Sequence, residues 1–393
     1  MRPVATCKKF SIRQKNNMKT AILTIDDQSN YGNRLQNYAM QNVLKRFGDC
    51  QSLWWSVDFD LFTKQQFSFK EKIKFLLNYK NYQKKVVYDL PLLELKKFQI
   101  KKFTEKYIDV QQIDLLDNDL ENSYDFFITG SDQIWNPLFW LNKDKYAKAM
   151  FLQFCSPKKR IAYAASFGLS KLPYQYEKQF ASYIDSIEHI SVRENSAAKI
   201  IKNLTGRDVP VVLDPTLLIS AEQLASIEMR PEWYKGEKYI FTYFLGDIPR
   251  SVLEYAKKRN IKIYNLTDKR NVNIFASRVE EFIYLIHHCE LFCTDSFHGS
   301  VFAIQFRKPF IVMNRQEKGA PDMTCRIDTL LDTFNLKDRY FSFNSEEKDL
   351  EKALHPDYSN VDKILLRERE KSECFIKKSL RQTNRTDQCH TNR

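Results

Sequence analysis

A histidine with a hydroxyl and a glycine beside it follows a short apolar run late in the chain. In TDSFHGSVFA, residues 294–303, the preceding LFCT predicts a strand and the residues after His298 predict a helix. Ser296 and the first turn of such a helix can bind an anion, because free backbone N–H groups point out of a helix N-terminus. His298 is therefore a candidate acid, or a candidate donor of a hydrogen bond to a phosphate. Gly299, next to it, is a candidate substrate contact. The alternative is an ordinary turn histidine.

A second polar group follows the apolar run YDFFIT. The segment GSDQIWNP places Ser131, Asp132 and Gln133 just after this predicted strand. A carboxylate in this position can orient a hydroxyl or accept its proton, which makes Asp132 the second candidate catalytic residue. Ser131 and Gln133 are candidate substrate contacts. The alternative is that Ser131 and Asp132 only cap the next turn.

Two arginines extend the candidate site. Arg193 follows the predicted strand HISV, and its fork of N–H donors suits a carboxylate or a phosphate. An internal pair with Glu194 or with a carboxylate of another domain is the alternative. Arg34 lies in YGNRLQ, where a helix is expected to begin, with Asn33 and Gln36 as further candidate substrate contacts. Together these groups indicate a small anionic substrate, and they contain no metal constellation.

The elements that must position these residues alternate between apolar strands and amphipathic helices. Continuous apolar strands are typical of parallel sheets covered on both faces, whose ligands bind beyond the carboxyl ends of the strands. Two sets in tandem predict an α/β protein with two Rossmann-like, doubly wound domains, residues 18–205 and 206–345, that face a cleft. Residues 346–393 are expected to form a C-terminal helix and a basic tail. The predicted strands are 20–25, 50–58, 124–130, 159–168, 189–195, 209–218, 238–246, 261–267, 291–295 and 309–314.

Other segments give further expectations. Residues 64–107, rich in Lys, Phe and Leu, predict a helical insertion in the first domain that stays outside its sheet. Ser277 and Glu280 fit a capping box at the start of a helix, and the last helix is expected to begin at Ser359. The strand pattern after Met18 predicts the natural start of the chain there.

Composition excludes several classes of protein. The formal net charge is +13, but most of it falls in residues 1–17 and 377–393, which are expected to be tails. No basic surface interleaved with aromatic residues is apparent, so nucleic-acid binding is not expected, whereas peripheral contact with an anionic membrane fits. The chain has no apolar run of 18 residues and no GxGxxG or Walker pattern. A cytoplasmic protein, with or without membrane association, is expected.

The eight cysteines form no CxxC pair, which predicts free thiols in a reducing compartment. HHCELFC brings His287 and His288 close to Cys289 and Cys293 in sequence, as a metal site would. Both cysteines fit the pattern of small buried hydrophobic residues better. The sequence therefore predicts neither a metal nor a cofactor.

Five segments together resemble the polysaccharide pyruvyl transferase family. They are NYGNRLQNYAMQ (30–41), ITGSDQIWN (128–136), ISVREN (190–195), VLDPTLL (212–218) and TDSFHGSVFAIQFRKPF (294–310). The resemblance spans about residues 20–335 and implies a fold similar to the GT-B glycosyltransferases. By this resemblance, the family's functional arginine corresponds to Arg193 and its functional histidine to His298. Many members have an arginine two places before the histidine, where this chain has Ser296, and Arg34, Lys308 or Arg326 are the candidates to replace it.

The activity implied by the resemblance is transfer of a pyruvyl group from phosphoenolpyruvate to a glycan, lipid-linked or free. The product is a ketal and phosphate is released, with phosphoenolpyruvate as donor substrate and no cofactor. Two alternatives stay open at this point. A GT-B glycosyltransferase would use a nucleotide sugar, because fold does not fix function. A non-catalytic relative would bind carbohydrate and release no phosphate.

Overall fold

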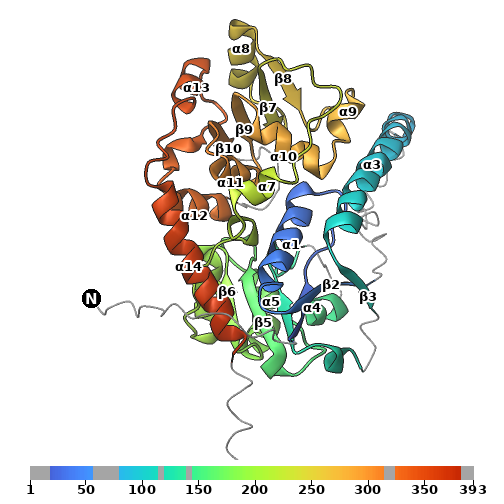
Figure 1. The fold of residues 1–393 in the computed structure, drawn as a ribbon, viewed down its shortest axis with the longest axis vertical. Helices are drawn as coiled ribbons and strands as arrows, with labels where there is room; N and C mark the ends of the chain where they lie inside the picture. Colours follow the sequence, from blue (N-terminus) through green and yellow to red (C-terminus); the bar gives the residue numbers. More distant parts are fainter. Residues whose placement is uncertain (1–17, 56–78, 114–118, 139–143, 314–323, 382–393) are drawn as a thin grey trace, which may run out of the picture.

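Two parallel β-sheets, one above the other in Figure 1, form the body of the molecule. The computed structural model describes residues 18–55, 79–113, 119–138, 144–313 and 324–381. The lower sheet comes from the first half of the chain and the upper sheet from the second half. This division follows from the two tandem sets of strands seen in the sequence.

The first sheet has six parallel strands in the order β3-β2-β1-β4-β5-β6, the strand order of a Rossmann fold. Every residue of β4 and β5 is buried, so helices must cover both faces. The strands are β1 (Lys19–Leu23), β2 (Asp49–Trp55), β3 (Val110–Ile113), β4 (Phe126–Thr129), β5 (Arg160–Ala165) and β6 (His189–Val192). The helices that follow or connect them are α1 (Tyr31–Leu44), α3 (Tyr79–Tyr107), α4 (Asp144–Met150), α5 (Tyr174–Asp185) and α6 (Asn195–Thr205).

The second sheet has five parallel strands in the order β11-β10-β9-β7-β8, which is also doubly wound. Its strands are β7 (Tyr239–Tyr243), β8 (Lys262–Asn265), β9 (Leu291–Thr294), β10 (Phe310–Met313) and β11 (Tyr340–Phe341). Its helices are α8 (Arg250–Arg259), α9 (Val272–Phe275), α10 (Val279–His287), α11 (Phe297–Gln305), α12 (Cys325–Phe334) and α13 (Glu347–Ala353), and the short α7 (Ala221–Ala225) precedes β7.

The last helix, α14 (Val361–Ser379), runs down one side of the molecule from the second sheet to the first (Figure 1). Ser372 accepts a hydrogen bond from the backbone N–H of Leu213 at 3.1 Å, and Arg369 donates to the carbonyls of Leu217 and Ile219. One cluster of buried apolar side chains extends through both units. Two Rossmann-like sheets tied together in this way give the GT-B-like α/β architecture predicted from the sequence.

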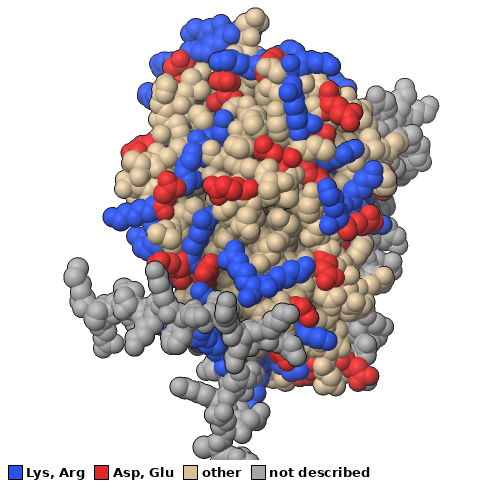
Figure 2. All heavy atoms as spheres, viewed as in Figure 1, with Lys and Arg blue, Asp and Glu red and all other residues tan. Residues whose placement is uncertain are grey.

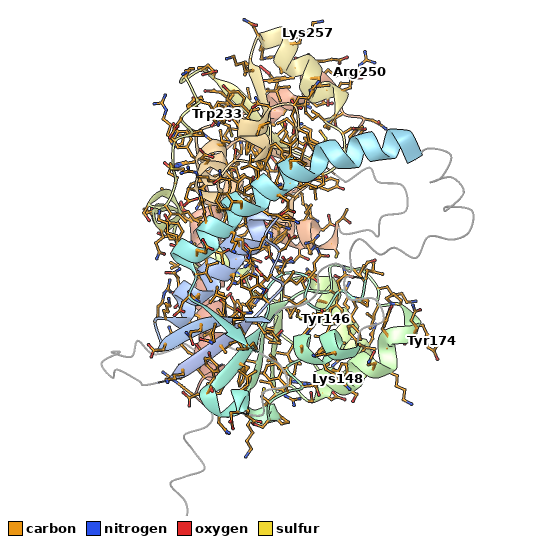
Figure 3. The ribbon with its side chains drawn as sticks, turned by 90° about the vertical axis from the view of Figure 1, so that its right-hand side faces the viewer. Tyr146, Lys148, Tyr174, Trp233, Arg250 and Lys257 are labelled. Carbon is orange, nitrogen blue, oxygen red and sulfur yellow. The ribbon has the colours of Figure 1, made fainter. Side chains whose placement is uncertain are left out.

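The first turn of α1 lies against the second unit. The hydroxyl of Tyr31 donates to the carbonyl of Ser277 at 2.9 Å, and its ring stacks on Phe282 of α10 at 4.7 Å. Helix α3 crosses the same junction as a long diagonal (Figure 3). Its Lys96 places the ammonium 4.8 Å from the centre of the Tyr31 ring and 5.4 Å from that of Phe275, and burial lowers the pKa of Lys96 to about 8. Helices α3, α9 and α10, which carry Lys96, Phe275 and Phe282, thus fix the junction beside α1.

Some sequence predictions need correction. Residues 209–218 form no strand but a single bridge from Val211 to Val192 and a 3-10 turn at Pro215–Leu217, because Pro210 and Pro215 bracket the apolar run. Helix α10 has Arg278 at its N-cap, and the Arg278 N–H donates to the side chain of Glu281 at 2.8 Å, so the capping box predicted at Ser277 and Glu280 is wrong. The last helix begins at Val361, two residues after the predicted start.

The segment predicted as a helical insertion at 64–107 is the crossover between two strands of the first sheet. Its described part is the helix α3, and β3 follows directly after it. Neither β3 nor β11, strands of four and two residues, was predicted. Residues 64–78 lie outside the described part of the chain, and the domain borders at 205–206 and 345–346 stay predictions.

On the face drawn in Figure 2, basic and acidic side chains are interspersed over the described surface. Ion pairs are common among the charged side chains of the described residues, as between Arg259 and Glu347 at 2.8 Å. None of the described helices is both long and apolar enough to cross a lipid bilayer.

Candidate functional site

Asp214 is the shared partner of three predicted site residues. The carboxylate is 2% exposed and lies just before the 3-10 turn at Pro215–Leu217. Its Oδ2 accepts from Ser131 Oγ at 2.9 Å and from Arg193 Nη1 at 2.8 Å, and it lies 3.6 Å from His298 Nε2. Thr216 holds the other oxygen through its N–H and its hydroxyl, at 3.0 and 2.6 Å. The structure therefore collects residues that follow β4, β6 and β9 around one buried charge.

The turn after β4 supplies Ser131 and Asp132. Asp132 has a φ of 59°, in the left-handed region that aspartate tolerates better than most residues. Its Oδ2 accepts from the side chain of Asn33 at 2.8 Å, and its Oδ1 lies 3.7 Å from Arg193 Nη2. Asp132 thus joins the first turn of α1 to Arg193 and does more than cap its own turn.

Arg193 is 4% exposed and lies at the carboxyl end of β6. Arg193 does form an internal ion pair, the alternative that the sequence left open. Its partner is Asp214, whereas Glu194 Oε2 is 3.9 Å from Arg193 Nε. The guanidinium also lies 4.4 Å from the centre of the Phe297 ring. Among the described residues, Nε and Nη2 of Arg193 have no hydrogen-bond partner, so two donors remain for a ligand.

His298 sits in the first turn of α11, directly over the start of α1. Ser296 caps α11 by accepting from the N–H of Gly299 at 3.2 Å. His298 is 7% exposed, and its Nε2 has no hydrogen-bond partner among the described residues. A Cβ at Gly32 would lie 2.4 Å from the imidazole. Gly32 is therefore what lets the two helix starts, one from each unit, approach each other.

Replacing Gly32 by alanine should displace the His298 ring and destabilise the protein by about 1–3 kcal/mol, because the overlap involves the base of the side chain and not a flexible tip. Chemical denaturation measures the change. The matched control is Gly246→Ala, since a Cβ there meets nothing within 4 Å and the backbone needs no left-handed conformation. Equal stability of the two variants would contradict the close approach.

Arg326 of α12 brings a second guanidinium to Phe297. Its Cζ lies 5.8 Å from the ring centre, and its buried Nε has no hydrogen-bond partner among the described residues. Burial and the neighbouring Arg193 lower the pKa of Arg326 to about 10. Arg34, in contrast, is occupied internally: it pairs with Asp26 and donates to the carbonyl of Ile25 at 2.7 Å.

The other predicted contacts position this group. Gln36 donates to Thr24 at 2.9 Å and accepts from the N–H of Ser131 at 3.3 Å. Gln133 accepts from Asn136 at 3.1 Å. Helix α1 begins at Tyr31, three residues before the expected start near Arg34, so Asn33 lies within its first turn and not before it.

The pKa values of the three buried carboxyl groups shift in different directions. Burial alone would raise the pKa of Asp214, but the charges of His298 and Arg193 outweigh burial and hold it well below its usual range. The same neighbours lower the pKa of Asp132. Burial raises the pKa of Glu194, whose Oε1 accepts from Ser166, although its neighbours oppose the change. Two carboxylates are therefore ionised beside the cations at neutral pH.

A cavity of about 820 Å³ opens at the other end of the first sheet. Lys19, Asp49 and Tyr124, which line it, lie at the amino ends of β1, β2 and β4. Ligands of parallel sheets bind beyond the carboxyl ends, so we place the candidate site at the buried cluster around Asp214 and not in this cavity.

The model of one protein family, polysaccharide pyruvyl transferase, matches residues 30–317 of this chain. That span is well over half of the sequence and holds the turn of α1, Asp132, Arg193, Asp214 and His298. The chain belongs to the polysaccharide pyruvyl transferase family. Members of this family are enzymes, so the cluster of side chains around Asp214 lies in an enzyme. A comparison with curated protein sequences found no match.

Solved structures similar to this pyruvyl transferase family member are remote. MurG of Acinetobacter baumannii is 8% identical, with 91% of this chain and 95% of MurG covered and a TM-score of 0.41. UDP-N-acetylglucosamine 2-epimerase of Rickettsia bellii is 11% identical, with 93% and 96% covered and a TM-score of 0.43. ADP-heptose heptosyltransferase II of E. coli is 12% identical, with 89% and 99% covered and a TM-score of 0.37. Similarities this low decide nothing about substrate.

Sequence reasoning did not select three residues of the pyruvyl transferase cluster: Asp214, Gly32 and Phe297. Asp214 lies in VLDPTLL, where an aspartate follows an apolar run just as Asp132 does, and that position was the available signal. Gly32 lies in the segment NYGNRLQNYAMQ, where nothing in the sequence indicates its close approach to His298. No pattern in the sequence relates Phe297 to Arg326, which is 29 residues further on.

Proposed function

We propose that this protein transfers a pyruvyl group from phosphoenolpyruvate to two hydroxyls of a sugar in a cell-surface polysaccharide or its precursor. The observation that carries the proposal is a set of nitrogens without hydrogen-bond partners among the described residues. They are Nε and Nη2 of Arg193, Nε of Arg326 and Nε2 of His298. All three side chains lie around Phe297. Such a set suits a small molecule with both a phosphate and a carboxylate.

The reaction balances with the groups at hand. A sugar hydroxyl attacks the enol carbon that bears the phosphate and loses its proton, and the neighbouring methylene takes up one proton and becomes a methyl group. The bond to phosphate then breaks, a second hydroxyl attacks the same carbon, and its proton leaves with the phosphate. The product is a ketal that retains the carboxylate.

Each residue has a role in this scheme. His298 acts as the acid or donates a hydrogen bond to the phosphate. Asp132, ionised and fixed by Asn33, orients or activates a hydroxyl. Arg193 holds the donor's carboxylate or phosphate with its two unoccupied nitrogens. Because His298 and Arg193 are less than a tenth exposed, donor entry requires the two units to part.

Arg326 supplies the cation that Ser296 does not. Ser296 is used as the N-cap of α11, whereas Arg326 reaches Phe297 from α12. Two guanidiniums beside one ring repel each other, and a bound dianion relieves this repulsion. Arg34 is occupied internally, so Arg326 is the best-placed candidate among the arginines considered.

Phosphoenolpyruvate should therefore raise the melting temperature of the protein, and Arg326→Ala should weaken its binding by about 10–100-fold because a charge-assisted contact is lost. The melting temperature without ligand should change little, since the repulsion between Arg326 and Arg193 opposes the attraction of Arg326 to Asp132 and Glu194. Thermal shift titration measures both. Arg250→Ala is the control, because Arg250 is exposed on α8.

The same titration separates the alternatives. A nucleotide-sugar glycosyltransferase would be stabilised by a nucleoside diphosphate sugar and not by phosphoenolpyruvate. A carbohydrate-binding relative would respond to glycans only. Either outcome would overturn the assignment of the donor.

A further inference from the structure

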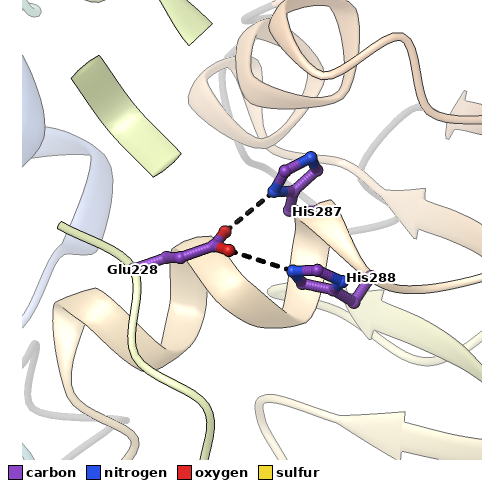
Figure 4. A group of neighbouring side chains, drawn as sticks. All are labelled: Glu228, His287 and His288. Carbon is purple, nitrogen blue, oxygen red and sulfur yellow. Dashed lines mark hydrogen bonds and ion pairs between the residues drawn. The ribbon is translucent and has the colours of Figure 1, made fainter. Parts of the chain in front are cut away.

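Two histidines and a glutamate converge on the side of the second unit, outside the cluster around Asp214. His287 ends α10, His288 follows it, and Glu228 lies just after α7 (Figure 4). Nδ1 of His287 is 2.8 Å from one carboxylate oxygen of Glu228, and Nε2 of His288 is 3.0 Å from the other. One ligand atom from each residue lies within 4.8 Å of the other two.

Packing holds both imidazoles in place. The His287 ring stacks on Phe306 with centroids 4.1 Å apart, and the His288 ring stacks on Tyr284, also at 4.1 Å. The next residue after Glu228 is fixed by a hydrogen bond from the Met229 N–H to the carbonyl of Glu280 at 3.1 Å. The ligand atoms are therefore arranged before any ion arrives, which lowers the entropic cost of binding.

The chemistry of the set selects one class of ion. Two imidazole nitrogens and one carboxylate oxygen suit borderline divalent transition ions such as Zn²⁺, whereas Mg²⁺ prefers oxygen ligands and keeps its waters. The side chains are 32%, 39% and 19% exposed for His287, His288 and Glu228, so an ion can enter and water can complete its coordination. Cys289 is buried and donates instead to the carbonyl of Ile286.

We propose that Glu228, His287 and His288 form a site for one divalent transition ion of the Zn²⁺ class. A bound ion would join the segment after α7, which leads from the first sheet to the second, to the end of α10. Because α10 also packs against Tyr31 of α1, the ion would stabilise the arrangement of the two units. The proposed ion site does not depend on which donor or acceptor the reaction uses. It differs from the expectation drawn from the sequence, which predicted no metal.

The test is calorimetric titration of tag-free protein with Zn²⁺, together with its melting temperature. One equivalent should bind and raise the melting temperature, and Mg²⁺ should do neither. Glu228→Gln and His288→Ala should each weaken binding by at least about tenfold, since even outer contacts of metal sites cost that much. Affinity should also fall at acidic pH, because protons compete for the two imidazoles.

His355→Ala serves as the control, because it removes a histidine outside the group and should leave binding unchanged. Glu228→Gln retains the size of the side chain and an oxygen acceptor, so a folded variant is expected. If the protein binds no equivalent of Zn²⁺, the three residues form only hydrogen bonds and the site is refuted. Unchanged binding in the His287→Ala, His288→Ala double variant would place the ion elsewhere and refute it equally.

Discussion

Replacing His298 by alanine should lower the rate of phosphate release from phosphoenolpyruvate by about 10²–10⁴-fold, the usual cost of losing one positioned acid. His298 Nε2 has no hydrogen-bond partner among the described residues and lies 3.6 Å from Asp214 Oδ2, so the variant loses a charge contact and no hydrogen bond. The free energy of unfolding should change by about 1 kcal/mol, because His298 lies in the first turn of α11 and its contact with Asp214 is longer than a hydrogen bond. Steady-state kinetics and chemical denaturation measure the two effects.

The matched control is His189→Ala. His189 begins β6, at the amino end of the same sheet that carries Arg193 at its carboxyl end, and it is only partly buried. Its loss should leave turnover within about twofold of the parent, because surface and strand-end changes rarely reach the site. A His298 variant with normal turnover and a lower melting temperature would identify His298 as a turn histidine.

The largest loss of stability is expected for Asp214→Asn, at about 3–5 kcal/mol, because the buried charge of Arg193 loses its only hydrogen-bonded carboxylate among the described residues. Asparagine keeps the shape of the side chain, so the change isolates the charge. The control is Asp208→Asn. Asp208 pairs with Lys202 at 2.6 Å on the surface, where such pairs contribute about 0–1 kcal/mol.

The pH dependence gives the sign of the Asp214 contribution. Its pKa is lower in the folded than in the unfolded protein, where a carboxyl group titrates near about 3.9. The stabilisation is therefore complete above that pH and is lost as the pH falls below it. Unfolding free energies at pH 7 and at progressively lower pH should converge for the parent and Asp214→Asn. A constant gap down to the most acidic pH would contradict the ion pair.

Local patterns predicted most of the fold because the spacing of apolar residues differs between strands and helices. The runs at 20–25 and 291–295 became β1 and β9, and the helices after them carry Gly32 and His298. The edge strand β3 was missed because its sequence, VQQI, is largely polar and exposed, and β11 was missed because it has only two residues. The run at 209–218 failed for the opposite reason, since prolines interrupt a composition that is otherwise strand-like.

Three residues of the candidate site were selected by one rule, that functional residues come after the strands of a parallel sheet. The rule selected Asp132, Arg193 and His298, and it placed Arg34 among them although its donors are occupied by Asp26 and Ile25. The contribution of Asp214 could not be derived, because only the folded chain brings one carboxylate to residues 83 positions before and 84 positions after it. Pairings between distant segments are set by packing and leave no local signal.

One measurement tests the central claim most directly: phosphate release by the purified protein with phosphoenolpyruvate and a panel of lipid-linked and free glycans, followed by mass analysis of the acceptor. The proposed function predicts that phosphate appears only when donor and a suitable glycan are both present, with one pyruvyl ketal formed per phosphate. It also predicts that Arg326→Ala requires more phosphoenolpyruvate for the same rate. Glycan modification that depends on a nucleotide sugar, with phosphoenolpyruvate left intact, would contradict the proposed function.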